Sequence, residues 1–132
     1  MPKRHKRLYA AVAVIERRGR ILICRRHAHD SFGGLWEFPG GKREPGETWE
    51  ACLRRELREE IGVAVRAIRP YDTMRHEFED GTVLFRVFRC AIARGKPKAL
   101  DAQALRWVQV KHLGRYRFPP ANHSVIARLA LG

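Results

Sequence analysis

The 132-residue chain has no apolar run approaching the ~20 residues that a membrane-spanning helix requires. Its cysteines are odd in number and scattered, at Cys24, Cys52 and Cys90, with no CxxC pair. This usage predicts reduced thiols, not a disulfide framework or a zinc knuckle. No apolar segment with a small-residue cleavage site follows the basic N-terminus. We therefore expect a cytoplasmic protein without a signal peptide or a membrane partner.

Acidic residues are also scarce, with 14 Asp and Glu against 27 Lys and Arg and a net charge of +13. Six of the acids fall between Gly41 and Val63, where five basic residues leave a local charge of −1, so the rest of the chain carries +14. A basic surface attracts polyanions such as nucleotides, nucleic acid or phosphorylated metabolites, and charge balance does not choose among them. We expect no stable nucleic-acid partner and a monomer.

Hydrophobic periodicity predicts a single mixed domain, α/β or α+β, over residues 8–132, with a disordered basic tail over residues 1–7. Strands are expected over residues 8–15, 21–24, 36–38, 63–68, 71–78, 82–93 and 105–110. Residues 40–46 are expected to form a loop. Residues 48–61 predict an amphipathic helix that ends at Gly62, and Pro119-Pro120 predicts the start of a second helix that ends near Leu131.

Three glutamates occupy one side of the predicted central helix. Glu56 and Glu60 are four residues apart and Glu59 is three residues after Glu56, so their carboxylates lie on neighbouring parts of one face. Carboxylates at this spacing repel one another unless something neutralises them, and carboxylate oxygens suit Mg²⁺ or Mn²⁺. Arg55 can hold the Glu59 carboxylate in place. The alternative is a solvated charged face held together by Arg–Glu pairs.

The glutamates belong to a longer pattern that fixes nine positions over 23 residues. These positions are Gly41, Glu47, Arg55, Glu56, Leu57, Glu59, Glu60, Gly62 and Val63. The pattern resembles the box of the Nudix hydrolases, which cleave a nucleoside diphosphate linked to another group. The resemblance implies an α/β/α sandwich around a mixed sheet. It also implies Mg²⁺, or alternatively Mn²⁺, held by these glutamates of the helix and by the main-chain carbonyl of Gly40, with Glu47 and Arg55 in supporting roles.

Two further segments are similar to the MutT branch of that family: "LWEFPGGK" at residues 35–42 and "FPPANHSVIARL" at residues 118–129. MutT-type enzymes hydrolyse 8-oxo-dGTP to the monophosphate and pyrophosphate, and so remove an oxidised precursor from the nucleotide pool. The resemblance implies that Asn122 hydrogen-bonds the oxidised base. A side-chain amide suits this task because it offers a donor to O6 and an acceptor to N7–H. The alternative is that Asn122 caps the last helix.

The same resemblance implies further substrate-binding residues, which are Phe38, Phe78, Asp80, Arg26 and Lys42. Phe78 would pack on the base or sugar, Asp80 would bond within the pocket, and Phe38 would offer backbone groups to the base. Three of these residues have a plainer alternative role: Phe78 in the core, Asp80 in a turn, and Arg26 on the surface.

One position departs from MutT. Just before Trp107, where MutT carries a glutamate that joins the metal site, this chain has Arg106. The change leaves the metal count open and makes Glu56 the preferred base or water-orienting carboxylate. It also predicts that Arg106 binds phosphate or pairs with a box glutamate. CTP or a modified pyrimidine triphosphate is the alternative substrate. A non-catalytic module that recognises oxidised guanine is a further alternative, although such modules usually lose box glutamates that this chain retains.

Overall fold

The computed structural model describes residues 5–30 and 32–132. Its elements in chain order are β1 (Lys6–Arg17), β2 (Arg20–Arg25), β3 (Trp36–Glu37), β4 (Gly40–Lys42), α1 (Trp49–Ile61), β5 (Ala64–Phe78), β6 (Gly81–Arg94), β7 (Ala104–Gln109), the 3-10 helices η1 (Val110–Arg115) and η2 (Pro120–Asn122), and α2 (His123–Ala130). None of the helices in these two described ranges is long and apolar enough to cross a membrane.

The N-terminal boundary differs from the expected tail over residues 1–7. Residues 1–4 lie outside the described part of the chain, but Lys6 and Arg7 already belong to β1. They pair in parallel with Gly81 and Thr82 of β6, and the Lys6 amide donates to the carbonyl of Asp80. β1 therefore begins before the apolar residues that predicted it. The backbone groups of Lys6 and Arg7 form hydrogen bonds with β6, and this pairing does not require apolar side chains.

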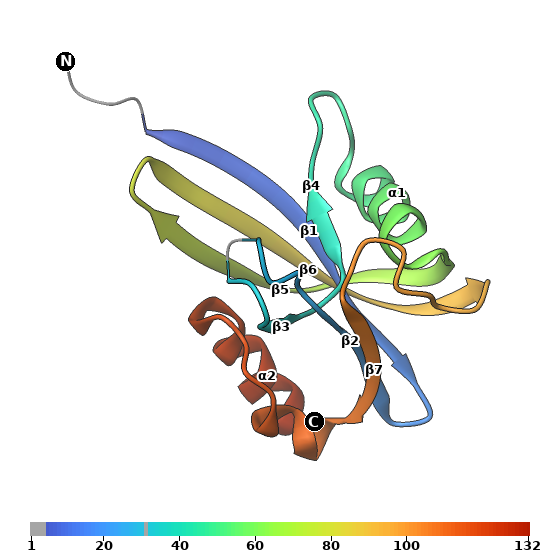
Figure 1. Cartoon of the computed structure of the whole chain (residues 1–132). Coiled ribbons are helices and arrows are strands. Elements are labelled where there is room, and N and C mark those ends of the chain that lie inside the picture. Colours follow the sequence, from blue (N-terminus) through green and yellow to red (C-terminus); the bar gives the residue numbers. More distant parts are fainter. Residues whose placement is uncertain (1–4, 31) are drawn as a thin grey trace.

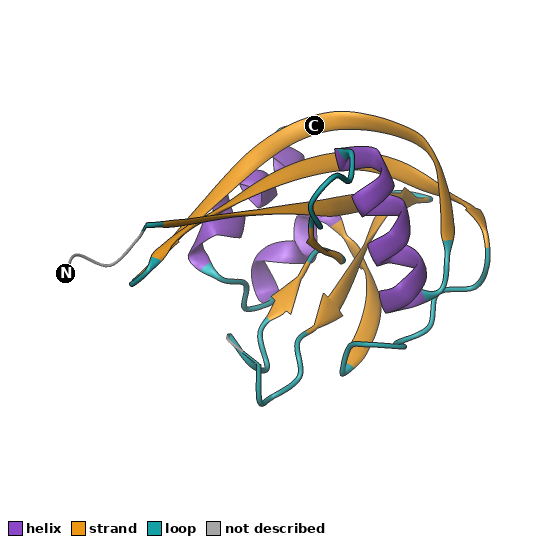
Figure 2. Ribbon diagram, turned by 90° about the horizontal axis from the view of Figure 1, so that it is seen from above, coloured by secondary structure: helices purple, strands orange, loops and turns teal. Residues whose placement is uncertain are grey.

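The strands form a seven-stranded mixed sheet in which β1 is central. The main path runs β3-β2-β1-β6-β5, while β4 pairs with β1 and β7 pairs with β2. β1 and β6 are parallel, and β5 and β6 form a long antiparallel hairpin. Seen from above, these three long strands curve side by side (Figure 2).

Helices cover both faces of the sheet, as the α/β/α sandwich requires (Figure 1). Alternate residues of β1 point to opposite faces, so Ala13 and Ile15 pack with α1 and Val12 and Val14 pack with α2. Each face thus has its own apolar core, and the expected mixed fold class is confirmed. Because α1 packs directly on β4 and β1, the glutamate helix and the glycine strand are fixed relative to each other.

Local signals define both ends of α1, and the end at Gly62 was predicted from the sequence. Thr48 caps the N-terminus, with its hydroxyl oxygen accepting from the Ala51 amide at 3.1 Å. Gly62 closes the helix in the left-handed conformation at φ 73° and donates to the Arg58 carbonyl. The buried stripe comprises Cys52, Leu53, Leu57, Glu60 and Ile61. Glu60 is therefore the one charged member of an otherwise apolar face among the described residues of this helix.

Three expectations about elements were wrong, each for a non-local reason. Residues 40–42 form a strand and not a loop, because β1 offers free backbone groups at Ala10–Val12. The two strands expected over residues 63–68 and 71–78 are one strand, β5, which stays paired with β6 across several register shifts and the positive φ of Ala67. Val110 begins a 3-10 helix in place of ending a strand.

Candidate active site

The glycine strand β4 lies between β1 and the face of α1 that carries Glu56. A Cβ atom on Gly40 would stand 2.1 Å from the carbonyl oxygen of Ala11, and one on Gly41 would stand 2.1 Å from Oε2 of Glu56. Only glycine permits both approaches. The Glu56 carboxylate therefore lies directly against the backbone of the strand that supplies the Gly40 carbonyl.

Glu60 is buried, with 8% of its surface exposed. Its Oε1 accepts from the Cys24 thiol at 3.1 Å, and its Oε2 accepts from the Gly40 amide at 3.4 Å. Burial raises the pKa of Glu60 to about 8, because water no longer solvates the charged form, while these two hydrogen bonds act in the opposite direction. A cation beside Glu60 would remove this penalty, so the carboxylate is suited to hold one.

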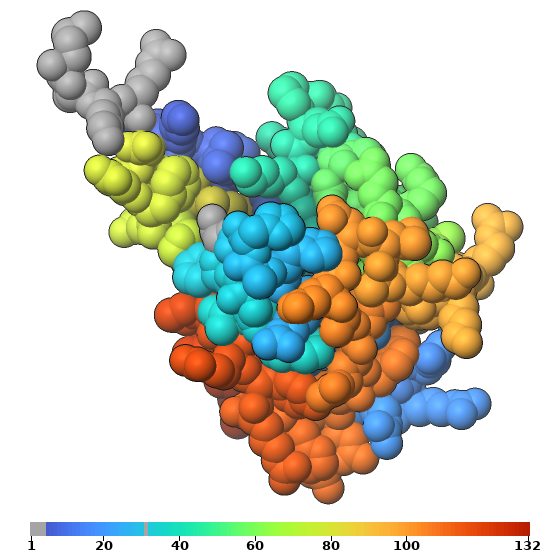
Figure 3. Space-filling model, viewed as in Figure 1, coloured from blue at the N-terminus to red at the C-terminus, as the bar shows by residue number. Residues whose placement is uncertain are grey.

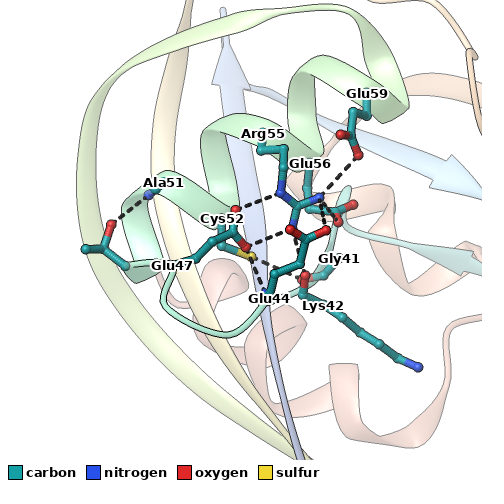
Figure 4. Close-up of polar contacts among 10 residues, drawn as sticks. Gly41, Lys42, Glu44, Glu47, Ala51, Cys52, Arg55, Glu56 and Glu59 are labelled. Atoms are coloured by element: carbon teal, nitrogen blue, oxygen red, sulfur yellow. Dashed lines mark hydrogen bonds and ion pairs between the residues drawn. The ribbon is translucent and has the colours of Figure 1, made fainter.

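Arg55 organises the rest of the acidic cluster (Figure 4). Its Nε and Nη2 donate to the two carboxylate oxygens of Glu47 at 2.7 and 2.9 Å, and its Nη1 donates to Glu56 at 2.7 Å and to Glu59 at 3.2 Å. Nη2 also donates to the Lys42 carbonyl at 3.0 Å. The hydrogen bonds from Arg55 lower the pKa of Glu47 to about 2. Arg55 thus ties the loop before the helix to the glutamate face and fixes the Glu56 carboxylate.

The three box glutamates of α1 have different surroundings. Glu56 faces Gly41, Glu60 faces Cys24 and Gly40, and the Glu59 side chain is 60% exposed beside Arg55. Among the residues that the structure describes, the group whose ligand atoms all lie within 4.8 Å of one another is Cys24, Glu37 and Glu60. This group contains one thiol and two carboxylates, and neither Glu56 nor Glu59 belongs to it. A hard divalent cation requires carboxylate and carbonyl oxygens together with water, so it would use the carboxylates and not the thiol.

Glu37 is a site residue that the sequence analysis missed. It follows Trp36 in the short strand β3, which pairs with β2 so that Glu37 lies opposite Cys24. Its carboxylate accepts from Nη1 of Arg26 at 2.7 Å. Burial raises the pKa of Glu37, and Arg26 partly offsets the effect. The signal in the sequence was an acidic residue inside the apolar segment "LWEFP". Burying its charge costs free energy unless a partner pairs with it.

A narrow pocket of about 70 Å³ adjoins Glu37. It is lined by Val12, Arg26, Phe32, Glu37, Phe38, His76, Phe85, Pro119, Ala121 and Asn122. Phe32 and His76 meet edge to face across it at 5.1 Å. Ligand pockets usually measure ~300–1,000 Å³, so a nucleotide base requires these walls to move apart.

Asn122 lies at the base of α2 and is buried, with 7% of its surface exposed. Its Nδ2 donates to the Pro119 carbonyl at 3.3 Å, and its side chain makes no capping hydrogen bond to the helix. The structure therefore does not show the capping role that was the alternative for this residue. It instead brings Asn122 to the pocket together with two other expected substrate-binding residues, Phe38 and Arg26.

The remaining expected substrate-binding residues lie elsewhere. Phe78 and Asp80 flank the tight turn between β5 and β6, where Phe78 pairs with Gly81, and the structure does not bring them to the pocket. His76 and Phe85 occupy the corresponding pocket wall. Lys42 is exposed at the end of β4, and its carbonyl is engaged by Arg55.

Arg106 points away from the acidic cluster. Its neighbours Leu105 and Trp107 pack on the α1 side of the sheet, whereas Arg106 lies over the rings of Trp36 and Tyr116 at 5.5 and 5.8 Å. No ion pair between Arg106 and a box glutamate occurs among the described residues. The alternation of side chains along β7 explains this orientation.

The sheet with one helix on each face and the box of glutamates against a glycine strand define a nucleotide-hydrolase type of site. A family profile described as the NUDIX domain matches residues 10–128, and the chain belongs to this family.

Among curated proteins, the chain is 35% identical over 125 residues to the 8-oxo-dGTP diphosphatase of Escherichia coli (strain K12), covering 94% of this chain and 97% of that protein. It is 33% identical over 117 residues to the CTP pyrophosphohydrolase of the same organism, covering 89% and 87%. Among solved structures, MutT studied from Aliivibrio salmonicida and Vibrio cholerae superposes with a TM-score of 0.81 at 35% identity, covering 94% of this chain and 97% of that one.

Proposed function

We propose that this chain is a metal-dependent nucleoside triphosphate pyrophosphohydrolase that converts 8-oxo-dGTP to 8-oxo-dGMP and pyrophosphate. The observation that carries the proposal is the position of Glu37, which lines the pocket of Asn122 and also lies within 4.8 Å of Glu60 and Cys24. A nucleotide whose base is held at Asn122 would therefore extend its phosphates along β4 toward the glutamates. Relatives named 8-oxo-dGTP diphosphatase support the same reading.

Asn122 would select the base. In 8-oxoguanine O6 accepts and N7–H donates, whereas plain guanine has an unprotonated N7. The Asn122 amide can donate to O6 through Nδ2 and accept from N7–H through Oδ1. With plain guanine the amide oxygen would face a second acceptor in a buried place, and such a mismatch is costly. The adjacent Phe38 and Phe85 would supply the apolar walls against which the ring packs.

Glu56, Glu59, Glu60 and the Gly40 carbonyl would hold Mg²⁺, with Mn²⁺ as a substitute. A bound divalent ion neutralises the diphosphate and lowers the pKa of water. Glu56, fixed by Arg55, would accept a proton from the attacking water. The water oxygen would bond to the β-phosphorus as the bond from that phosphorus to the α,β-bridging oxygen breaks, so the bridging oxygen leaves with the monophosphate. Arg26, which lines the pocket, and Lys42, at the end of β4, would contact the nucleotide.

The proposal also includes the expected oligomeric state, partners and location of the protein. The enzyme would act on a free nucleotide as a monomer, without a stable nucleic-acid partner. All three cysteines are buried free thiols, which supports a reducing, cytoplasmic location. A CTP or modified pyrimidine triphosphate remains the alternative substrate because a relative is named CTP pyrophosphohydrolase. The complete set of box glutamates disfavours a non-catalytic recognition module.

Product analysis tests this function. Incubation with 8-oxo-dGTP should give monophosphate and pyrophosphate in Mg²⁺, and nothing in EDTA. Glu56→Gln should lower kcat by several orders of magnitude, and titration with Mn²⁺ monitored by electron paramagnetic resonance should show weaker ion binding, while the circular dichroism spectrum stays unchanged. Full activity in EDTA or in the variant would refute the proposed mechanism. Diphosphate and free phosphate as products would instead show that the β,γ-anhydride is cleaved, and would contradict the proposed pose of the substrate.

A further inference from the structure

A groove of about 510 Å³ along the edge strand β7 is lined by basic side chains that the proposed function does not use. Arg20 comes from β2, Arg106 from β7, and His112 and Arg115 from η1. Tyr116 adds an aromatic wall, and Trp107, whose side chain packs on the α1 side of the sheet, also borders the groove. In Figure 3 the orange surface of β7 and η1 borders the blue surface of the β1–β2 hairpin. We propose that this groove, called here the β7 groove, binds a compact oligophosphate anion such as pyrophosphate.

Charge is the first argument. No acidic side chain is among the described residues that line the β7 groove, and none of the ion pairs of the described part of the chain involves Arg20, Arg106 or Arg115. The pKa of His112 is lowered, first by desolvation and then by Arg115, Lys111 and Arg20. Cations that converge without an acidic partner create a positive potential that an anion relieves.

The second argument is the geometry of Arg106. Its Nη1 donates to the Tyr116 hydroxyl at 3.5 Å, and its guanidinium lies over the rings of Tyr116 and Trp36, which meet edge to face at 5.3 Å. A guanidinium held in this way presents its remaining N–H groups in a fixed fork, which matches pairs of phosphate oxygens. Three arginines together favour an anion with several charges over a single carboxylate.

The third argument is separation from the site already described. None of the residues that line the β7 groove also lines the Asn122 pocket or belongs to α1. In Figure 1, β7 runs from the neighbourhood of α1 toward the end of the molecule where the C-terminus lies. The inference therefore does not depend on the proposed function. It also gives Arg106 a role that its departure from the MutT pattern left open.

The test is a nuclear magnetic resonance titration of the complete chain in EDTA at physiological ionic strength, with sodium pyrophosphate as the probe. Without divalent cations the glutamate cluster repels pyrophosphate, so binding there is suppressed. The side-chain signals of His112 and Tyr116 should shift and saturate. Arg106→Gln with Arg115→Gln should weaken binding at least ~10-fold, because charge-assisted hydrogen bonds are lost. The single variant Arg115→Gln, in the exposed part of η1, should weaken it in the same direction if the double variant does not fold.

The matched control is Arg66→Gln with Arg69→Gln, which removes the same charge from exposed positions on β5. It should leave pyrophosphate binding nearly unchanged. A parallel titration with a nucleoside diphosphate identifies the source of the phosphates, since tighter binding than pyrophosphate would mean that the aromatic wall receives a base. Shifts that never saturate, equal losses in both double variants, or saturation by a single-stranded oligonucleotide but not by pyrophosphate would each overturn the proposal.

Discussion

At the scale of single residues, the site depends on polar groups that burial would penalise unless each had a partner. Glu37 has Arg26, Glu60 has the Cys24 thiol and the Gly40 amide, and Asn122 has the Pro119 carbonyl. None of these partnerships is local in sequence except the last. The sequence therefore indicated Asn122 and the glutamates of the helix through a family resemblance. Of their contacts it predicted the Arg55–Glu59 pair, which the structure confirms, but it predicted no partner for Glu60 and it missed Glu37.

The Asn122→Ala substitution tests the role of the amide. Loss of one buried hydrogen bond with its mismatch penalty changes binding by ~1–3 kcal/mol, or roughly 10- to 100-fold. We expect kcat/KM to fall by this factor for 8-oxo-dGTP and much less for dGTP, measured by pyrophosphate release. Equal losses on both substrates would mean that Asn122 only supports the fold around Pro119.

At the scale of elements, local signals predicted α1 well, because its cap, its apolar stripe and its terminal glycine lie within one stretch of chain. The strand β4 was not predicted, because it exists through pairing with β1, some 30 positions earlier in the sequence. The merger of two expected strands into β5 has the same origin, since β6 supplies a continuous partner. Long-range pairing of this kind leaves no mark in a local hydrophobic pattern.

The two glycines of β4 should respond differently to alanine. Gly40 has a φ of 152° and its added Cβ would collide with the backbone of Ala11, so Gly40→Ala should destabilise the fold by about 2–4 kcal/mol. At Gly41 the collision is with the Glu56 carboxylate, which is the far end of a side chain and not backbone. Gly41→Ala should therefore retain most stability and lose most activity. Urea unfolding and pyrophosphate release measure the two effects, and a Gly41 variant of full activity would contradict the placement of Glu56.

At the scale of the whole molecule, a strongly basic chain surrounds a small acidic centre, and stability should depend on whether that centre holds a cation. The pKa of Glu60 is about 8 in the folded metal-free protein and near 4.5 when unfolded. Between these values the folded state binds more protons, so the contribution of Glu60 to stability is full below about pH 4.5 and falls as the pH rises toward about 8. Mg²⁺ should offset the loss.

Thermal unfolding in EDTA measures this dependence. From acidic pH toward pH 8 the Tm of the wild-type protein should fall relative to that of Glu60→Gln, in which the group cannot ionise. Mg²⁺ should raise the wild-type Tm more at the alkaline end, and should raise the variant less. If the Tm of the two proteins depends on pH in the same way, ionisation of Glu60 does not cause the pH dependence of stability.

Substrate identity is the central claim, and a competition assay tests it most directly. Equal concentrations of 8-oxo-dGTP, dGTP and CTP are mixed with the enzyme and Mg²⁺, and mass spectrometry follows the disappearance of each. The relative rates give the ratios of kcat/KM without separate calibration. We predict that 8-oxo-dGTP is consumed first, at least ~10-fold faster than dGTP, because one well-placed buried hydrogen bond discriminates between the two bases by about this factor. Faster consumption of CTP, or equal consumption of 8-oxo-dGTP and dGTP, would contradict the account.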